Sequence, residues 1–385
     1  MRISNGGTVS PTELARLETP CAIAPLSGLR SNIERMQALA DRHGLALRPH
    51  VKTHKCPRIA RLQLEAGAVG ITCSKSEETA AFLEAGCQDV LAAYPLHDSR
   101  GLDRVLEAAR SRGARVSTIA GDPASAAFLA RQAQRHGVTL PVFVKIDVGL
   151  RRVGLRADHP DLIALARTVD GSPRLEFAGI LSHAGHAYGA SGIAEIRAVA
   201  LAEAQAMALA KERIEAAGMA VRTVSVGSTP TVLAAESFQE IDEIRPGNYV
   251  FLDGTALRLG VASTRDTAFF VLAAVVAVND AYVVVDAGSK ALSSDMGPHG
   301  MRGATGYGAA TDLEGRPCGV LSKLSEEHGF IERGDAPGLA PGDRILITPN
   351  HACSTANSAP RLYVFPEDGV GQPEAWDIVA RGMLR

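Results

Sequence analysis

Between residues 27 and 255 the chain alternates between two hydrophobic patterns. Apolar residues spaced about 3.6 apart predict amphipathic helices, and short continuous apolar runs predict strands buried on both faces. We predict strands at 45–50, 70–74, 89–95, 115–120, 141–147, 175–183, 221–227 and 243–251, and helices at 27–44, 56–67, 76–86, 100–113, 122–137, 159–170, 193–218 and 230–237. Eight alternating units predict an α/β fold, a TIM-like (β/α)8 barrel. An open doubly wound sheet is the alternative, which the missing G-x-G-x-x-G turn disfavours.

After about residue 256 the pattern changes. The runs at 267–280, 281–289 and 343–350 are rich in β-branched residues and are separated by glycine and proline, which predicts strands. A short apolar run at 21–26 could join them. The predicted organisation is therefore a barrel over 27–255 and a mostly β domain built from 1–26 and 256–385.

The composition fits an ordinary globular protein: 46% of the 385 residues are hydrophobic, 21% are charged, and the formal net charge is −2. No global field favours nucleic acid or a membrane surface, so we expect neither as a partner. No apolar run approaches the roughly 18–20 residues of a membrane helix, and the N-terminal segment lacks a secretory apolar region. Six scattered cysteines fit a reducing compartment, so we expect a cytoplasmic protein.

Active sites of (β/α)8 barrels lie at the carboxyl ends of the strands. The segment "LRPHVKTHKC" (47–56), at the end of the first strand, concentrates cationic and imidazole side chains around Lys52. Lys52 is either a solvated surface lysine or a reactive amine in a dry barrel mouth. If it is reactive, His50, His54 and Lys55 are expected to help keep it deprotonated.

Three further strand ends carry candidate groups. "VGSTPT" (226–231) offers Gly227, Ser228 and Thr229 at a helix start, either as a phosphate site or as an ordinary N-cap followed by proline. "DVGLRRVG" (147–154) lacks a P-loop ending, so nucleotide binding is rejected there, although one of its two arginines could face the barrel mouth. "HAGHAYG" (183–189) places two histidines and a tyrosine together, as either functional or structural groups.

The β domain contains one candidate metal pair. In "PNHACSTAN" (349–357), His351 and Cys353 are two residues apart after an apolar strand, so their side chains can point the same way. An imidazole and a thiolate are good zinc ligands, with water or substrate completing the shell. The alternative is a packed histidine and an inert cysteine.

Five motifs in order, "RPHVKTHK", "GSTPT", "RPGNYVFLD", "VDAGSKALSSD" and "PNHACSTAN", resemble those of the D-serine dehydratase and D-threonine aldolase family, over about residues 19–357. The resemblance implies pyridoxal 5′-phosphate enzymes of the alanine-racemase-like fold type III, usually homodimers. It implies that Lys52 is bonded to the cofactor, that "GSTPT" with Tyr249 holds its phosphate, and that Arg152 lies near its pyridine nitrogen. The cofactor-binding residues expected from it are Lys52, His50, Arg152, His186, Tyr188, Gly227, Ser228, Thr229 and Tyr249.

The same resemblance gives His351 and Cys353 a divalent metal and, with Lys52, a catalytic role. Aldolases of the group carry H-x-D at this motif, whereas the dehydratase-like members, including those acting on D-threo-3-hydroxyaspartate, carry H-x-C. Thiolate favours Zn²⁺ over Mn²⁺ or Mg²⁺. The interpretation is a dehydratase of a D-3-hydroxy amino acid that gives a 2-oxo acid and ammonia.

Four alternatives stay open from the sequence. They are retro-aldol cleavage to glycine and an aldehyde, racemisation, a non-catalytic cofactor carrier, and an unrelated barrel with a phosphate site. The carrier is disfavoured by the second domain. Arg245, Lys290 and Arg302 are further cations that could serve substrate carboxylates, and whether the metal pair serves its own chain's Lys52 stays undecided.

Overall fold

The structure, a computed structural model, describes residues 2–4, 7–298, 303–369 and 371–381. Within these residues eight parallel strands form one sheet in the order β4-β11-β10-β9-β8-β7-β6-β5. These strands are β4 (Ala46–Leu47), β5 (Ile71–Cys73), β6 (Asp89–Ala92), β7 (Arg115–Ala120), β8 (Leu140–Lys145), β9 (Leu175–Leu181), β10 (Val224–Val226) and β11 (Glu243–Ile244).

The two end strands of this sheet approach each other, because His50 after β4 forms a parallel bridge with Thr72 of β5. Backbone hydrogen bonds from Val69 to Leu47 (2.9 Å) and from Thr72 to Pro49 (2.7 Å) run across the same join. The predicted parallel barrel is therefore confirmed, with each of its eight strands inside or beside the range expected from the sequence.

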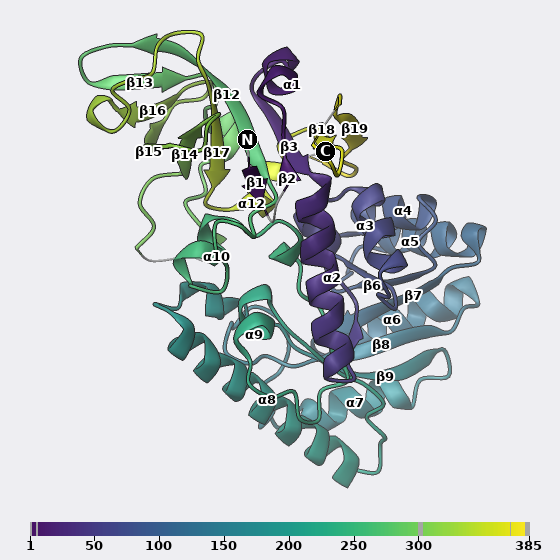
Figure 1. The fold of residues 1–385 in the computed structure, drawn as a ribbon. Coiled ribbons are helices and arrows are strands. Elements are labelled where there is room, and N and C mark those ends of the chain that lie inside the picture. The colour runs from purple at the N-terminus through teal and green to yellow at the C-terminus, as the bar shows by residue number, and fades with distance from the viewer. Residues whose placement is uncertain (1, 5–6, 299–302, 370, 382–385) are drawn as a thin grey trace.

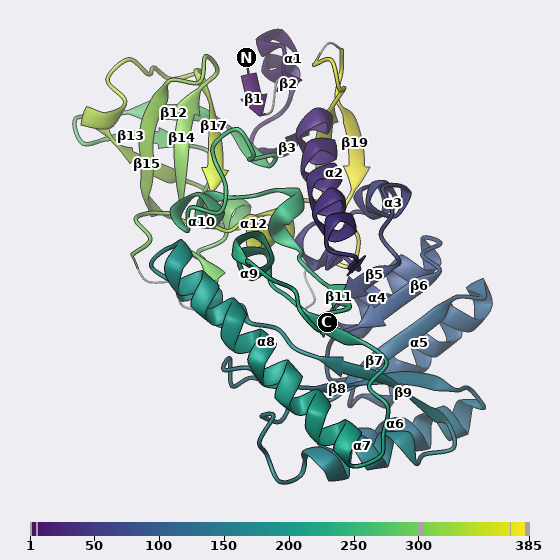
Figure 2. The ribbon, with the colours of Figure 1, turned by 60° about the horizontal axis from the view of Figure 1, so that its bottom comes forward.

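Helices cover the outside of the barrel, and the long α8 lies along its surface (Figures 1 and 2). They are α2 (Leu26–Arg42), α3 (Pro57–Glu65), α4 (Ser76–Glu84), α5 (Ser99–Arg112), α6 (Pro123–His136), α7 (Leu162–Asp170), α8 (Ile193–Ala216) and α9 (Thr229–Ala234). Local chemistry sets several starts: Asp98 accepts hydrogen bonds from the first turn of α5, and Asp122 with Ser125 forms a capping box on α6.

A second sheet forms the β domain: most of its strands are green at the upper left of Figure 1, and the others are purple and yellow to their right. In the described residues its order is β13-β16-β15-β14-β17-β12-β3-β18-β19, and β12 also pairs with β13, so six of its strands close on themselves. They are β3 (Cys21–Pro25), β12 (Phe270–Val278), β13 (Tyr282–Val285), β14 (Gly308–Asp312), β15 (Pro317–Leu324), β16 (Gly329–Glu332), β17 (Arg344–Pro349), β18 (Arg361–Phe365) and β19 (Glu374–Asp377). The N-terminal β3 pairs with β12 and β18 and leads directly into α2.

Short elements complete the described chain. They are β1 (Arg2–Ser4), β2 (Gly7–Thr8), α1 (Pro11–Arg16), α10 (Gly254–Arg258), α11 (Ser289–Leu292), α12 (Ala352–Ala356) and 3-10 turns at Val51–Thr53, Gly185–Gly189, Asn248–Val250 and Arg333–Asp335. No helix of the described residues is long and apolar enough to cross a membrane. The six cysteines are all unpaired.

A buried ion network holds strands β4, β6, β10 and β11 together inside the barrel. Arg48 donates to Glu243 at 2.7 Å and to Asp89 at 2.6 Å, and Ser225 donates to the other Glu243 oxygen at 2.6 Å. Arg245 continues the network by donating to Ser225. Since each of these charges has a partner, the network fixes the Arg245 side chain at the base of the candidate site.

Candidate active site

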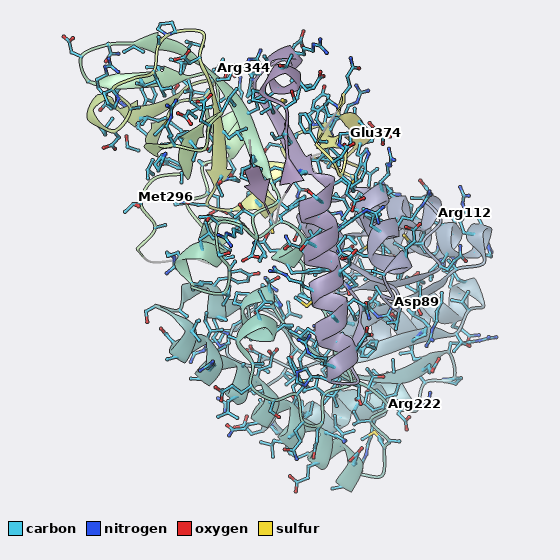
Figure 3. All side chains as sticks on the ribbon, viewed as in Figure 1. Asp89, Arg112, Arg222, Met296, Arg344 and Glu374 are labelled. Atoms are coloured by element: carbon cyan, nitrogen blue, oxygen red, sulfur yellow. The ribbon has the colours of Figure 1, made fainter. Side chains whose placement is uncertain are left out.

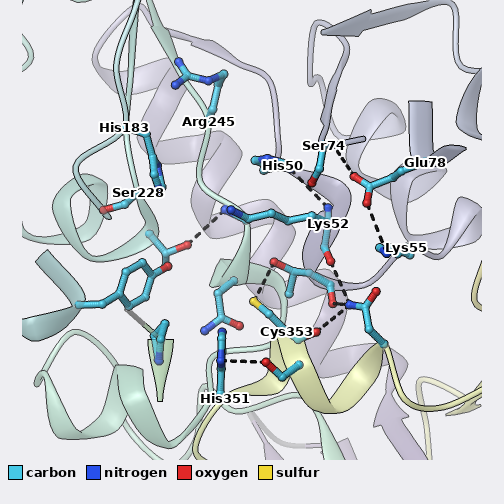
Figure 4. Close-up of a pocket in the computed structure, with 18 of the residues that line it drawn as sticks. His50, Lys52, Lys55, Ser74, Glu78, His183, Ser228, Arg245, His351 and Cys353 are labelled. Atoms are coloured by element: carbon cyan, nitrogen blue, oxygen red, sulfur yellow. Dashed lines mark hydrogen bonds and ion pairs between the residues drawn. The ribbon is translucent and has the colours of Figure 1, made fainter. Parts of the chain in front are cut away.

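Two adjoining cavities of about 340 and 540 Å³ lie at the carboxyl ends of the barrel strands. They share the side chains His50, Lys52, Ser74, Lys75, His183 and Arg245. The smaller cavity is also lined from the β domain, by Asp295, His351 and Cys353 among others. Such volumes suit a small molecule, and the two domains together build the site (Figure 4).

Lys52 projects from the 3-10 turn after β4, and its side chain extends toward His183 and Ser228 (Figure 4). Burial lowers the pKa of the Lys52 amine; the Cys353 side chain acts in the opposite direction, and Arg152 lowers the pKa further. Burial and the nearby Lys52 also hold the pKa values of His50 and His183 well below the usual imidazole value, which makes both rings neutral. The amine is therefore placed for nucleophilic or base chemistry.

His50, His54 and Lys55 are not among the main causes that lower the pKa of the Lys52 amine, contrary to the prediction. His54 is turned into the core between Phe82 and Phe251, and burial lowers its pKa to about 3. The Nζ of Lys55 lies 3.6 Å from a carboxylate oxygen of the buried Glu78. The pKa of Lys52 is lowered instead by burial and by Arg152 and Arg245, which come from other parts of the barrel.

The loop after β10 forms a polar cradle beside Lys52. Gly227 has φ of +118°, and a Cβ there would approach Val232 to 3.0 Å, so the tight turn requires glycine. Ser228 is the N-cap of α9 in a capping box with Thr231, as the ordinary interpretation holds, yet Ser228 and Thr229 also line the cavity. The amide groups at this helix start favour an anion.

The loop after β11 closes the cradle from the other side. Gly247 donates from its backbone to the Thr229 hydroxyl at 3.2 Å, and a Cβ at Gly247 would lie 2.9 Å from the His50 carbonyl. His183 is held by a 3.0 Å hydrogen bond between its Nδ1 and the Gly227 carbonyl. Three strand ends are therefore packed directly around Lys52.

The donor set of the cavities fits pyridoxal 5′-phosphate. An aldehyde needs a deprotonated amine, and a phosphate needs cations and amide donors. Lysine and arginine outnumber carboxylates on the two cavity walls: the cations are Lys52, Lys55, Lys75, Lys145, Arg152 and Arg245, and the carboxylates are Glu78, Asp147 and Asp295. This excess favours an anionic ligand.

The remaining predicted cofactor residues divide into two groups. Arg152 lines the larger cavity and Tyr188 lines the smaller one. His186 lines neither cavity, and its ring lies against Gly149 of the neighbouring loop. Tyr249 is also outside: its ring is fully buried and its hydroxyl accepts a 2.9 Å hydrogen bond from Gln63. The phosphate role predicted for Tyr249 does not fit this placement, and Gly247 and Asn248 face the cavity instead.

His351 and Cys353 lie beside their own chain's Lys52 segment, because the Cys353 sulfur is 3.2 Å from the hydroxyl of Thr53. The reason expected for their common direction was wrong. His351 is the N-cap of α12 and Cys353 lies in its first turn, so a helix start and not strand alternation turns both toward the cavity.

The surroundings of this pair fit a divalent cation. Asp295 bonds to Nδ1 of His351 at 2.6 Å, which leaves the other ring nitrogen for a metal. Burial alone would lower the pKa of His351, but Cys353, Asp253 and Asp295 raise it to about 9. Groups that attract a proton this strongly also attract a metal ion. No cluster of three such ligands exists in the described residues, so other ligands would have to complete the shell.

Several charged groups of the site were not predicted. Glu78 and Asp295 line the smaller cavity, and Lys145 lines the larger one, near the buried Glu203. Lys145 was visible as a lysine inside the apolar run "PVFVK", and Asp295 belongs to one of the quoted motifs. Met296, next to Asp295, lies between α11 and β14, on a loop below the β domain in Figure 3.

The three further cations considered for binding substrate carboxylates lie in different places. Arg245 lines both cavities. Lys290 is exposed, pairs with Glu327 and faces a different cavity. Arg302 lies outside the described residues.

Lys145 gives a pH-dependent prediction. Burial, aided by Arg245, lowers its pKa to about 7, whereas the unfolded chain keeps the ordinary value near 10.5. Between these values the unfolded state binds more protons, so stability rises with pH in the parent apoprotein. In thermal melts from pH 7 to 10, the melting temperature of the parent should therefore rise steadily relative to that of Lys145→Met. A difference in midpoint that does not change with pH would contradict the lowered pKa of Lys145.

Two family models match the chain. The alanine racemase N-terminal domain matches residues 25–254, and a putative serine dehydratase domain matches residues 268–365. The first match spans the barrel and the second spans most of the β domain.

Characterised proteins match over nearly the full length. The chain is 38% identical to D-threo-3-hydroxyaspartate dehydratase from Delftia sp. (strain HT23), over 92% of this chain and 96% of that protein. It is 31% identical to D-threonine aldolase from Arthrobacter sp., over 97% and 95%. The solved structure of the Delftia dehydratase covers 96% of this chain and 99% of its own, with a TM-score of 0.89 and 35% identity. A cysteine-to-alanine variant of a D-threo-3-hydroxyaspartate dehydratase, 35% identical to this chain, has been solved in the metal-free form.

Proposed function

The chain belongs to the family of D-serine dehydratases and D-threonine aldolases, pyridoxal-phosphate enzymes with the alanine-racemase-like fold, and on this premise we propose that it dehydrates a D-3-hydroxy amino acid. The products are a 2-oxo acid and ammonia. The observation that carries the proposal is the contact between the Cys353 sulfur and Thr53, which brings the metal pair to the segment that bears Lys52.

Lys52 has two tasks in this proposal. Its amine would hold the cofactor through the aldehyde group, and its Nζ would take the proton from the substrate Cα. Bound pyridoxal phosphate supplies an electron sink for the charge left at Cα, and a bound metal supplies a Lewis acid for the departing hydroxyl. Burial lowers the pKa of Lys52, which increases the share of its amine that is free to accept that proton.

The other residues of the site would bind and orient the cofactor. Gly227, Ser228 and Thr229 would bind the phosphate at the start of α9, with His50, Arg152 and Tyr188 on the remaining walls. His186 and Tyr249 keep their neighbours in place, since neither reaches the cavities.

We propose Zn²⁺ as the metal. His351 and Cys353 offer one imidazole and one thiolate, which suit zinc better than Mn²⁺ or Mg²⁺, ions that prefer oxygen ligands. Asp295 would fix the orientation of the His351 ring through the 2.6 Å contact at Nδ1.

Among possible substrates, D-threo-3-hydroxyaspartate is the first candidate, followed by D-serine and D-threonine. Its second carboxylate suits cavity walls on which cations outnumber acids. A homodimer, with twice the 40.3 kDa mass of the chain, and a cytoplasmic location complete the proposal.

Product identity tests the reaction. With D-threo-3-hydroxyaspartate we expect oxaloacetate and ammonia in equal amounts, loss of both after chelation, and recovery with zinc; the L-isomers should be inert. Glycine and glyoxylate would identify retro-aldol cleavage instead. Full activity after complete metal removal would exclude the role of His351 and Cys353, and absence of turnover with every D-3-hydroxy amino acid would leave a cofactor carrier.

A further inference from the structure

Thr53 and Asn357 connect the predicted metal ligand to the predicted cofactor lysine, and neither has a role in the proposed reaction. Thr53 follows Lys52 in the 3-10 turn and is completely buried. Its hydroxyl lies 3.2 Å from the sulfur of Cys353, a residue 300 positions away in the chain. A buried hydroxyl at this distance donates to a thiolate and stabilises its charge.

Asn357 makes a second connection through the backbone. Its side-chain amide donates to the Cys353 carbonyl at 2.7 Å and to the Lys52 carbonyl at 3.1 Å. The first bond caps the C-terminal end of α12, and the second joins that helix to the turn bearing Lys52. An amide has two N–H donors, so one side chain satisfies both carbonyls.

These contacts hold α12 at two points. Its first turn is held at the Cys353 sulfur and its last turn at the amide of Asn357. The five-residue helix, Ala352–Ala356, has little internal cooperativity of its own, so outside contacts have to fix the direction of the Cys353 side chain. Hydrogen-bonded partners of metal ligands set ligand orientation in this way.

We propose that Thr53 and Asn357 are positioning residues of the metal site, with Thr53 donating to the Cys353 thiolate and Asn357 fastening α12 to the Lys52 turn. The inference rests on the proposed metal pair. It adds that the turn bearing the cofactor lysine also supplies an outer contact of the metal, so that cofactor attachment and metal binding share one piece of structure.

The test measures metal binding directly, by competition with a chromophoric zinc chelator on the cofactor-loaded protein. Thr53→Val keeps the shape and removes the hydroxyl, and we expect zinc affinity to fall by about 10–100-fold. Thr53→Ser keeps the hydroxyl and should retain the parent's affinity. Thr72→Val is the matched control: Thr72 is also completely buried, and its hydroxyl donates to the Arg48 carbonyl, away from Cys353. Its zinc affinity should equal that of the parent.

Cobalt provides a readout that general loosening of the fold would not give. In Co²⁺-substituted protein, the thiolate-to-cobalt absorption band should move to longer wavelength in Thr53→Val, because the sulfur loses a hydrogen bond, and stay in place in Thr53→Ser and Thr72→Val. Asn357→Leu should weaken zinc binding without moving the band, since Asn357 contacts Cys353 at its carbonyl and not at its sulfur.

The outcomes separate the inference from the proposed function. If the parent binds no zinc or cobalt, the metal pair itself is wrong. If the parent binds both, a parent-like affinity and band in Thr53→Val overturn the inference. Equal losses in Thr53→Val and Thr53→Ser, or in Thr53→Val and Thr72→Val, overturn it as well, because packing and not the hydroxyl would then account for the effect.

Discussion

Replacing Lys52 by alanine is expected to abolish cofactor attachment and to reduce ammonia release by at least about 10²–10⁴-fold, the range attributed to a lost general base. The structure gives the reason: the amine lies where two cavities meet, and its pKa is lowered by burial. The measurements are the visible absorbance of the purified variant with added pyridoxal phosphate, and ammonia release under single-turnover conditions.

Lys290→Ala is the control for this experiment. Lys290 is exposed, pairs with Glu327 and lies outside both cavities, so its loss should change neither the absorbance nor the rate. A Lys52→Ala protein that keeps both the visible band and parent-like turnover would show that the cofactor is bonded elsewhere.

Substitution of His351 or Cys353 by alanine is expected to have the next largest effect. Each change removes one of the two proposed protein ligands, so zinc content should fall below one per chain. Turnover should fall by about 10²-fold or more, since a Lewis acid contributes several kcal/mol to the barrier. Zinc added to the chelated parent should restore activity, and zinc added to either variant should not. Metal analysis and ammonia assays on the same samples decide the outcome.

Two companion variants sharpen this prediction. Cys318→Ala removes a buried thiol of the β domain, outside both cavities, and should leave zinc content unchanged. Cys353→Asp should shift metal preference from Zn²⁺ toward Mn²⁺, because a carboxylate oxygen replaces a thiolate. Parent-like zinc content in both His351→Ala and Cys353→Ala would place the metal elsewhere.

The barrel could be predicted from the sequence because its signals are local. Strands such as Leu140–Lys145 are buried on both faces and therefore read as apolar runs, and helices such as Ser99–Arg112 carry one apolar face. The rule that barrel chemistry gathers at the strand ends then placed Lys52, His50 and Ser228 on a common cavity wall.

The directions of individual side chains were not available from such signals. Tyr249 belongs to the motif "RPGNYVFLD" after β11, but its hydroxyl points to Gln63 on α3, a partner 186 positions away. His186 turns toward Gly149, and His54 turns into an aromatic cluster. In each case contacts between distant elements decide the rotamer. The spacing of residues in the sequence does not reveal these contacts.

The joining of the two domains was likewise beyond the sequence. "RPHVKTHK" and "PNHACSTAN" are both visible as motifs, yet the 3.2 Å contact between Thr53 and Cys353 depends on how the β domain rests on the barrel. Glu78 was missed for a related reason, since its position at the start of α4 is typical of an exposed acid, while the fold buries it beside Lys55.

The most direct measurement is reduction of the cofactor-loaded protein with borohydride, followed by peptide mapping of the pyridoxyl label. We expect one label per chain, on the peptide that contains Lys52, in a protein that also retains one zinc ion. A label on Lys145, Lys75 or any other lysine, or no label at all, would contradict the placement of the cofactor on which the whole account depends.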